Sequence, residues 1–367
     1  MKKIQIGNRS ISKDSPTFII AEGATNHNNR LDLGLRLIKE AAEAGADALK
    51  VQTYTAERLV TKTAPCFWEM ADANEKVQGT QYDSYTKVDK LPDDAYYDMK
   101  EYADSLNIEF FSTPFSKEDV DFLEKVDVNL YKVASCDTTN LPLLKYIASK
   151  QKPIILSTGI SRIGEIEEAV EVIEDEGNDQ IVLLHCTITY PTPYDCVNLN
   201  AMKTMQKVFP DYPIGISDHT IGIEIALASV ALGSKCIEKH YTFDKSAGLS
   251  SDHWLAIDTS ELMQLVTKTR HIEMALGSPV KKIASSEQKA LLYARRSLVS
   301  AKSICKGKVV DSEDVTIKRP GTGIPPKYLD LIIGCRTLRD IQEDEVLQWT
   351  DFLAKEGLNE NICHDTC

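Results

Sequence analysis

Short apolar runs rich in β-branched residues recur along the chain, separated by longer stretches of mixed polarity. Their apolarity is continuous rather than alternating, which is typical of strands that are buried on both faces of a sheet. We therefore predict eight strands, at Thr17–Ala21, Ala46–Val51, Ile108–Phe111, Leu130–Ala134, Pro153–Leu156, Ile181–Leu184, Pro213–Ile216 and Lys235–Ile237.

The stretches between these runs carry helical signals. One helix is predicted to begin at Leu31 and to close at Gly45, and two others span Glu165–Glu174 and Ile223–Leu232. Alternating strands and helices imply a parallel sheet with right-handed crossovers. Eight repeats favour an α/β fold of the closed (β/α)8, or TIM, barrel type. The alternative is an open doubly wound sheet, but no Gly-x-Gly-x-x-Gly turn follows the first strand.

The length of the chain leaves room for a second, smaller domain. Of the 367 residues, a (β/α)8 barrel takes about 250. We expect the barrel over residues 1–280, a linker over 281–295, a small domain over 296–353 and a flexible tail over 354–367. Short strand or turn signals mark the small domain, at Ser297–Val299, Val309–Val310, Val315–Ile317 and Leu331–Ile333. The long segment 53–90 is expected to be an insertion over the mouth of the barrel.

Composition and charge remove several classes of function. The formal net charge of −13 argues against a nucleic-acid partner and against an anionic membrane surface, because both need a basic face. The sequence contains neither a signal-peptide pattern nor an apolar run long enough to span a bilayer. The nine cysteines include no Cys-x-x-Cys pair, and we expect reduced thiols in a cytoplasmic protein. Cys136, Cys186 and Cys236 are expected to be buried.

Polar and ionisable residues occur at the C-terminal ends of all eight predicted strands. In a (β/α)8 barrel the active site forms at the C-terminal ends of the strands, so this arrangement predicts a catalytic pocket. The residues in question are Glu22, Lys50 with Gln52, Ser112 with Thr113, Lys132 with Ser135 and Asp137, Ser157 with Thr158, His185 with Tyr190, Ser217 with His219, and Glu238 with His240.

Two lysines in this set suggest an anion site. Lys50 and Lys132 occupy nearby strand positions, and the hydroxyls of Ser135, Ser157 and Ser217 lie at similar depth, so together they suit a phosphate or a carboxylate. Two alternatives stay open. Either lysine can simply pair with a neighbouring acid, or a desolvated lysine can form a Schiff base with a carbonyl substrate.

Two histidines suggest a metal site. His219 and His240 end adjacent predicted strands, where two imidazoles can bind one divalent ion and leave positions open for substrate or water. Such an open site suits Mn²⁺ or a similar ion such as Mg²⁺ or Co²⁺. A closed zinc site is a poorer match, because it needs more nitrogen or sulfur ligands. His185 is a possible third ligand, although its apolar surroundings favour a role in the core.

Taken in order, these residues resemble the bacterial sialic acid synthase family, and the resemblance covers nearly the whole chain. The stretches that carry it are Ala21-Glu22 with Asn26-His27, Lys50-Val51-Gln52, Phe111–Phe115, Lys132–Ser135, Leu156–Gly159, His185–Thr187 with Tyr190–Pro193, Ser217–Thr220, Glu238–His240, Asp252-His253 and Lys318–Gly323. Each stretch is weak alone, but the ordered set is specific.

The resemblance implies a reaction and a set of partners. The family condenses phosphoenolpyruvate with N-acetylmannosamine or a 2,4-diacetamido-trideoxy hexose and releases phosphate, usually with Mn²⁺. The small domain resembles the antifreeze-like (SAF, β-clip) module, which in this family crosses to the barrel of the other subunit of a domain-swapped homodimer. The metal would polarise the sugar aldehyde as a Lewis acid.

The resemblance also implies a role for each matching residue. By this match, Lys50, Lys132, Ser135, Ser157 and Ser217 bind phosphoenolpyruvate, His219 and His240 bind the metal, Glu22, Asp137 and Tyr190 are catalytic, and Gln52, Glu238, Asp252 and Arg319 contact the sugar. Two positions depart from the family pattern. Asp137 stands where many members have glutamate, and Ile188 stands where relatives often carry Asn or Ser.

Two other functions remain to be weighed. A related synthase on the same fold makes a 3-deoxy acid from phosphoenolpyruvate and a phosphorylated sugar, but no extra arginine cluster follows the predicted strands. A non-enzymatic carbohydrate-binding protein would not need two lysines, two histidines and several acids at the strand ends. Nonulosonic acid synthesis is therefore the favoured function.

Overall fold

The computed structural model describes residues 1–66, 79–87, 90–247 and 252–353. The chain divides into two compact units, Met1–Gly277 and Ser278–Cys367, and each is described by itself. The predicted flexible tail, 354–367, lies outside the described residues.

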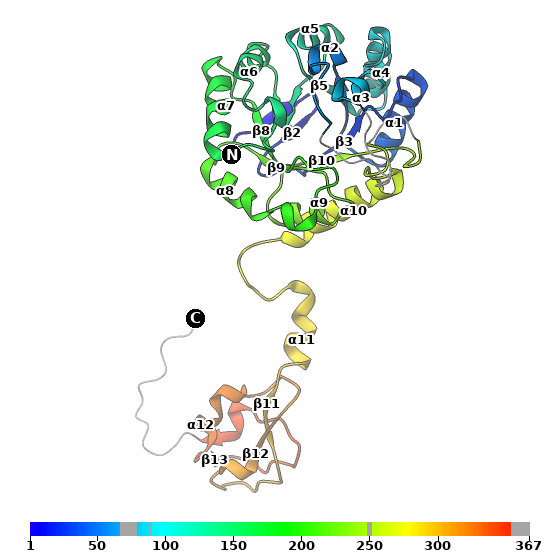
Figure 1. The fold of residues 1–367 in the computed structure, drawn as a ribbon. Helices are drawn as coiled ribbons and strands as arrows, with labels where there is room; N and C mark the ends of the chain where they lie inside the picture. The colour runs from blue at the N-terminus through cyan, green and yellow to red at the C-terminus, as the bar shows by residue number, and fades with distance from the viewer. Residues whose placement is uncertain (67–78, 88–89, 248–251, 354–367) are drawn as a thin grey trace. The chain divides into compact units, whose positions relative to one another are not determined.

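The first unit is an eight-stranded parallel barrel, as the sequence predicts (Figure 1). The strands are hydrogen-bonded in the order β5-β4-β3-β10-β9-β8-β7-β6, and β5 packs beside β6 where the barrel closes. The strands span β3 (Phe18–Ala24), β4 (Ala48–Thr53), β5 (Glu109–Pro114), β6 (Tyr131–Val133), β7 (Ile154–Ser157), β8 (Ile181–Cys186), β9 (Ile214–Asp218) and β10 (Cys236–His240).

All eight predicted strands are present, and most of them extend further toward their C-terminal ends than the apolar runs do. β10, for example, continues through Glu238 to His240, and β9 continues to Asp218. The polar side chains of Glu22, Lys50, Lys132, Ser157, Ser217, Glu238 and His240 are therefore part of the barrel wall, whereas Ser135 and His219 follow their strands directly. Strand backbone positions the side chains in the wall, which makes their placement more exact than a loop would.

In the part of the first unit that the structure describes, eight helices surround the barrel (Figure 1). Each of them buries apolar side chains in the barrel core. They are α1 (Leu31–Glu43), α4 (Asp93–Ser105), α5 (Lys117–Val126), α6 (Leu141–Ala148), α7 (Ile163–Asp175), α8 (Asn200–Val208), α9 (Glu224–Ala231) and α10 (Thr259–Leu276). Local signals set their ends. The Ser116 side chain caps α5, Asp258 forms a capping box on α10, and Gly45 and Gly233 adopt positive φ just beyond α1 and α9.

A short N-terminal hairpin, β1 (Ile4–Ile6) and β2 (Arg9–Ile11), was not among the predicted elements. Its isoleucines are buried in the barrel core. Arg9 bonds Asp47, just before β4, and the carbonyl of Asn107, just before β5. The hairpin therefore covers the N-terminal end of the barrel, opposite the end where the polar residues gather.

The second unit has a small core of its own. After η3 (Ser285–Glu287) and α11 (Gln288–Tyr293), it contains β11 (Ser297–Ser300), η4 (Ser312–Asp314), β12 (Val315–Lys318), η5 (Pro326–Tyr328), α12 (Leu329–Ile332), β13 (Arg336–Thr337), η6 (Trp349–Asp351) and β14 (Phe352–Leu353). Leu298, Ile304, Val310, Ile324 and Ile341 form the centre of its core. The strand or turn signal predicted at Leu331–Ile333 is wrong as a strand, because these residues end a helical turn whose Ile332 enters this core.

Candidate active site

A cavity of about 340 Å³ opens at the C-terminal ends of the barrel strands. The polar side chains that line it are Glu22, Thr25, Lys50, Gln52, Gln81, Ser84, Thr113, Lys132, Ser135, Cys136, Ser157, Cys186, Tyr190, Ser217, His219, Glu238, His240 and Asp252, and the apolar or aromatic ones are Tyr54, Leu59, Val60, Tyr85, Phe115, Ala134, Ile188 and Leu255.

Strand register explains why residues distant in sequence meet here. His240 on β10 is level with Glu22 on β3, and Glu22 is in turn level with Lys50 on β4. Glu238 is level with Ser217 on β9. Because the strands are parallel and side chains alternate between the two faces of a strand, these residues point into the same space inside the barrel.

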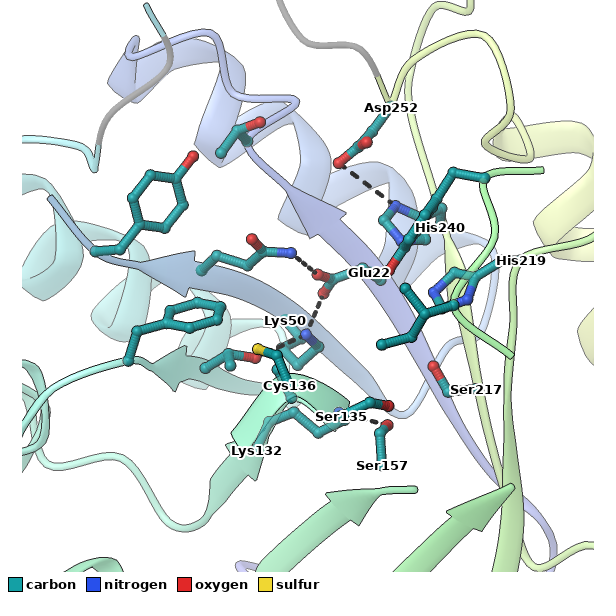
Figure 2. A pocket seen from close by; sticks show the side chains of 18 of the residues that line it. Glu22, Lys50, Lys132, Ser135, Cys136, Ser157, Ser217, His219, His240 and Asp252 are labelled. Carbon is teal, nitrogen blue, oxygen red and sulfur yellow. Dashed lines mark hydrogen bonds and ion pairs between the residues drawn. The ribbon is translucent and has the colours of Figure 1, made fainter. Parts of the chain in front are cut away.

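Two lysines and two glutamates that line the cavity form one buried network, of which Figure 2 shows Glu22, Lys50 and Lys132. Lys50 Nζ lies 2.9 Å from Glu22 Oε2 and 3.7 Å from Glu238 Oε2, and Lys132 Nζ lies 3.7 Å from Glu238 Oε1. All four side chains are less than a tenth exposed. Charges so removed from water persist only when they are paired, and an anionic ligand would find two fixed cations here.

Hydroxyl groups surround the two lysines. Lys50 donates a hydrogen bond to Thr113 Oγ1 (2.9 Å), and Lys132 donates one to Ser157 Oγ (2.6 Å). Ser217 donates to Glu238 Oε1 (2.9 Å), while Ser135 Oγ accepts from the backbone N–H of Gly159 (2.9 Å). The predicted set of phosphate-binding residues is thus brought together in one place, with Thr113 added to it.

The network shifts the acidities of its members in different directions. Burial raises the pKa of Glu22, whereas burial lowers the pKa of Lys132. Burial also opposes the charge of Lys50, but attraction by Glu22 and Glu238 outweighs it and raises the pKa of this lysine. Glu22 therefore holds a proton more readily than an ordinary glutamate does.

The two histidines lie side by side on the cavity wall. Their ring centroids are 5.2 Å apart, and the ring of Tyr190 is 4.2 Å from that of His219. His219 Nδ1 contacts the carbonyl oxygen of Thr187 (2.9 Å), which fixes the ring. His240 Nδ1 is buried without a hydrogen-bond partner and lies 3.7 Å from Asp252 Oδ2.

These features fit a divalent cation held by two imidazoles. An unsatisfied buried nitrogen is costly unless a ligand completes it. Among the described residues no group of three or more histidine, cysteine, aspartate or glutamate side chains forms a metal cluster. Two imidazoles supply two ligands, so an ion held by them alone would keep positions open for water or substrate oxygens, as catalytic sites do.

A buried ion pair stiffens the two strands that carry these histidines. Lys239 Nζ donates to Asp218 Oδ2 (2.8 Å) and also contacts the carbonyl of Thr220, and both charged side chains are about 1% exposed. Because Lys239 precedes His240 and Asp218 precedes His219, this bond ties together the ends of β10 and β9. It holds the distance between the imidazoles.

The turn after β6 differs from the expectation. The predicted catalytic residue Asp137 does not line the cavity: its carboxylate accepts a hydrogen bond from Asn140 (2.9 Å). Cys136, which was expected to be buried, is exposed and lines the cavity instead. The chain forms the 3₁₀ turn η1 (Ser135–Asp137) at this point, so the two-residue alternation of a strand no longer decides which side chain points inward.

The remaining predicted residues divide between the two units. Gln52 donates to Glu22 Oε1 (3.0 Å), and Gln52, Tyr190 and Asp252 all line the cavity. His185 contacts the carbonyl of Val197 (2.7 Å) and is not part of this cavity. Arg319 belongs to the second unit, where it is exposed and makes no hydrogen bond or ion pair with another described side chain or carbonyl.

Sequence reasoning missed the apolar part of the lining. Tyr54, Leu59, Val60 and Tyr85 come from the segment between β4 and β5, which contains α2 (Ala56–Leu59) and α3 (Gln81–Lys87). The length of this segment predicts an insertion at the mouth, and its described parts do line the cavity. No periodic pattern in such short helices indicates which side chains face inward.

Comparison with known proteins agrees with this site. Residues 37–281 match the model of the NeuB family, and residues 295–353 match that of the SAF domain. The chain therefore belongs to the NeuB family and carries a C-terminal SAF domain. It is 44% identical to an uncharacterized protein of Methanocaldococcus jannaschii, over 96% of this chain and 100% of that protein.

Two relatives with named activities indicate the class more closely. The chain is 40% identical to N,N'-diacetyllegionaminic acid synthase of Campylobacter jejuni, over 90% of this chain and 99% of that one. The crystal structure of N-acetylneuraminic acid synthetase from Leptospira borgpetersenii, in complex with citrate, has a TM-score of 0.70 and 35% identity, covering 79% of this chain and 95% of that one. These relatives place the present chain in the class of sialic-type acid synthases. Among the described residues, no helix is both long and apolar enough to cross a membrane.

Proposed function

We propose that this chain condenses phosphoenolpyruvate with an N-acylated amino-sugar aldehyde to give a nonulosonic acid and inorganic phosphate. The observation that carries the proposal is the buried pair Lys50 and Lys132, ringed by hydroxyls and set beside two imidazoles in one cavity. Membership of the NeuB family supports it. The proposed setting is a cytoplasmic homodimer.

The lysines and hydroxyls account for the binding of the first substrate. Lys50 and Lys132 attract its phosphate and carboxylate, and Ser135, Ser157 and Ser217 complete the contacts at the level where the strands end. Both ammonium groups are already fixed by Glu22 and Glu238. Little reorganisation is therefore needed when the anion binds.

The reaction then needs one group that gives and takes a proton. The enol carbon of phosphoenolpyruvate forms the new C–C bond with the aldehyde carbon, and the aldehyde oxygen takes a proton from Glu22. Positive charge develops on the carbon that bears the phosphate. Water adds to this carbon and returns a proton to Glu22. The C–O bond to phosphate then breaks, the added hydroxyl becomes the keto group, and its proton leaves with the phosphate.

Glu22 suits this task because it lines the cavity, lies against Lys50 and Gln52, and has a raised pKa. His219 and His240 would hold a divalent cation, proposed to be Mn²⁺, which when bound supplies Lewis-acid polarisation of an aldehyde oxygen. Tyr190 packs against His219, and Gln52, Glu238 and Asp252 are placed to contact the sugar. Arg319 would reach the sugar from the SAF domain of the partner subunit.

The direct test is phosphate release by the full-length protein with phosphoenolpyruvate, Mn²⁺ and a panel of amino sugars, with the product mass measured. In ¹⁸O-labelled water, cleavage of the C–O bond puts the label in the keto acid and leaves the phosphate unlabelled. Label in the phosphate, or phosphate release that does not depend on a sugar, would contradict the proposal. Phosphorylated sugars belong in the panel, because their preferential use would favour the related 3-deoxy acid synthases.

Lys132→Met is the matching variant. This substitution removes one of the two cations and keeps a side chain of similar length. We expect the KM for phosphoenolpyruvate to rise by about 100-fold, because the substrate loses a charged hydrogen-bond donor. Lys145→Met, at an exposed position on α6, is the control and should behave as the wild-type protein.

A further inference from the structure

Lys239 on β10 and Asp218 on β9 face each other across neighbouring strands, on the side of the barrel wall that is turned away from the cavity. The strand register pairs these two residues directly. Side chains alternate between the two faces of a strand, so the residues on either side of them, among them His219 and His240, line the cavity while the ion pair does not. The pair therefore lies behind the two imidazoles, out of reach of a substrate.

Hydrogen bonds from this pair fix the chain on both sides of His219. The register of β9 with β10 ends at Asp218 and Lys239, so it does not extend to His219. Lys239 Nζ instead donates to Asp218 Oδ2 (2.8 Å) and to the carbonyl oxygen of Thr220. The backbone N–H of Thr220 in turn donates to Asp218 Oδ1 (2.9 Å). The residues before and after His219 are thus bonded to one ammonium group, and we call Lys239, Asp218 and Thr220 the clip.

The loop after β8 orients the imidazole of His219 from another side. The backbone N–H of Thr192 donates to the carbonyl oxygen of His219 (3.0 Å), and His219 Nδ1 contacts the carbonyl oxygen of Thr187 (2.9 Å). These contacts fix the ring relative to β8, but they do not reach β10. Lys239, in contrast, connects the chain around His219 with the strand that carries His240.

Burial makes the ion pair a weak source of stability for the fold. Lys239 and Asp218 are 1% and 3% exposed, so both charges are removed from water. The free energy lost in removing two charges from water can exceed what their attraction returns, and apolar replacements of such pairs are often neutral or stabilising. Since two apolar residues would serve the barrel core about as well, the position of the pair beside both imidazoles indicates a role in the site.

The two candidate metal ligands occupy the next position after each member of the pair, since His219 follows Asp218 and His240 follows Lys239. Their ring centroids lie 5.2 Å apart (Figure 2). We propose that Lys239 and Asp218 are positioning residues of the metal site, which set the separation of the two imidazoles and thereby the affinity for Mn²⁺ rather than the stability of the barrel. Groups behind metal ligands commonly change metal affinity by about 10- to 100-fold. This inference rests on the proposed function, from which the ion is taken.

The experiment measures Mn²⁺ affinity and thermal stability separately, in the full-length protein without substrates. Lys239→Met leaves the buried carboxylate of Asp218 unpaired, so it should lower both the melting temperature and the affinity. The double substitution Lys239→Met with Asp218→Asn removes both charges and keeps an acceptor for the N–H of Thr220, so the melting temperature should return close to the wild-type value. Its Kd for Mn²⁺, read from the electron paramagnetic resonance of free Mn²⁺ well below the melting temperature, should remain about 10-fold or more above that of the wild type.

The control removes an ion pair at the other end of the barrel. Lys152, just before β7, lies 2.7 Å from Glu124 on α5, and Lys152→Met with Glu124→Gln should leave the Kd unchanged. A double variant of the clip that binds Mn²⁺ as tightly as the wild type would overturn the inference. So would one that remains as unstable as Lys239→Met, because the pair would then serve the fold. Both results leave the proposed function standing, whereas absence of Mn²⁺ binding by the wild-type protein would overturn its metal site together with the inference.

Discussion

Single side chains at the strand ends decide which group moves protons. Glu22 lines the cavity beside Lys50, whereas Asp137 is turned toward Asn140. We expect Glu22→Gln to lower kcat by at least about 100-fold, since loss of a general acid–base group costs that much or more. Asp137→Asn should lower it by less than about 10-fold. Steady-state phosphate release at saturating substrates measures both, and a larger loss in Asp137→Asn than in Glu22→Gln would restore the role first predicted for Asp137.

The paired imidazoles give a second prediction at this scale. His219→Ala and His240→Ala should each abolish tight Mn²⁺ binding, because one remaining imidazole cannot hold the ion, and should reduce turnover by at least about 100-fold. The signal of free Mn²⁺ in electron paramagnetic resonance reports binding independently of activity. His185→Ala is the control, since His185 contacts Val197 outside the cavity. Unchanged Mn²⁺ binding in either site variant would remove the metal site.

Residue identities at the strand ends could be predicted because a barrel confines its polar groups to one end. Their orientations could not all be predicted. Alternation along a strand places Glu22, Lys50 and Lys132 inward, but the 3₁₀ turn after β6 exchanges the expected positions of Cys136 and Asp137. Such a turn depends on packing against neighbouring strands, which a single sequence does not display.

Among the secondary-structure elements, continuous apolar runs gave the barrel strands, because strands buried on both faces carry that pattern. The hairpin β1–β2 was not predicted because its strands have only three residues each. Its alternating isoleucines and the Gly7-Asn8 pair are nevertheless a hairpin signal from which it could have been predicted. The apolar run Leu331–Ile333 favours a strand by composition, but Leu331 and Ile332 belong to α12, and Ile332 packs in the core of the second unit.

Two buried histidines in loops at the C-terminal end of the barrel should make the stability of the fold depend on pH. His27, after β3, and His253, before α10, are both buried, and burial lowers the pKa of each to about 4. An unfolded histidine titrates near 6.5, so between pH 6.5 and 4 the unfolded chain binds more protons than the folded one. Stability is therefore complete above pH 6.5 and is lost as the pH falls toward 4.

The size of this effect is on the order of 3 kcal/mol for His27 alone, from the shift in pKa. Urea unfolding at pH 7 and pH 5 measures about 2 kcal/mol of it, because pH 5 still lies above the folded pKa of about 4. His27→Gln should show a smaller difference between the two pH values than the wild-type protein, and the exposed His271→Gln is the matched control. An identical difference in His27→Gln and wild type would show that the buried imidazole is not the source.

In the whole molecule, the length of the chain and a change in its sequence pattern indicated two units. The change from long βα repeats to short strands around glycines and prolines predicts a small second domain, and the chain divides after Gly277, near the predicted boundary. The predicted linker, 281–295, contains the short helix α11. What a sequence cannot provide is the partner of an exposed side chain such as Arg319, because that partner need not belong to the same unit or the same chain.

The proposed domain-swapped dimer assigns that partner to the other subunit and predicts a specific pattern of complementation. Arg319→Ala should lower kcat/KM for the sugar by about 30-fold or more, as loss of a charged contact to substrate does, without changing the KM for phosphoenolpyruvate. A heterodimer of Arg319→Ala and Lys132→Met chains, co-expressed with different tags, should recover about half of the wild-type activity. One of its two sites then combines an intact barrel with an intact Arg319 from the other chain.

The reciprocal heterodimer separates this arrangement from the alternative. When both substitutions are on one chain and the other chain is wild type, a swapped dimer contains no intact site and should be nearly inactive. The barrel with Lys132→Met receives the native Arg319, and the native barrel receives the domain with Arg319→Ala. If Arg319 instead served the barrel of its own chain, the two heterodimers would exchange their results: the reciprocal one would keep about half of the activity and the first would have none. The pair of measurements thus assigns the arginine to one subunit or the other, whatever the absolute rate.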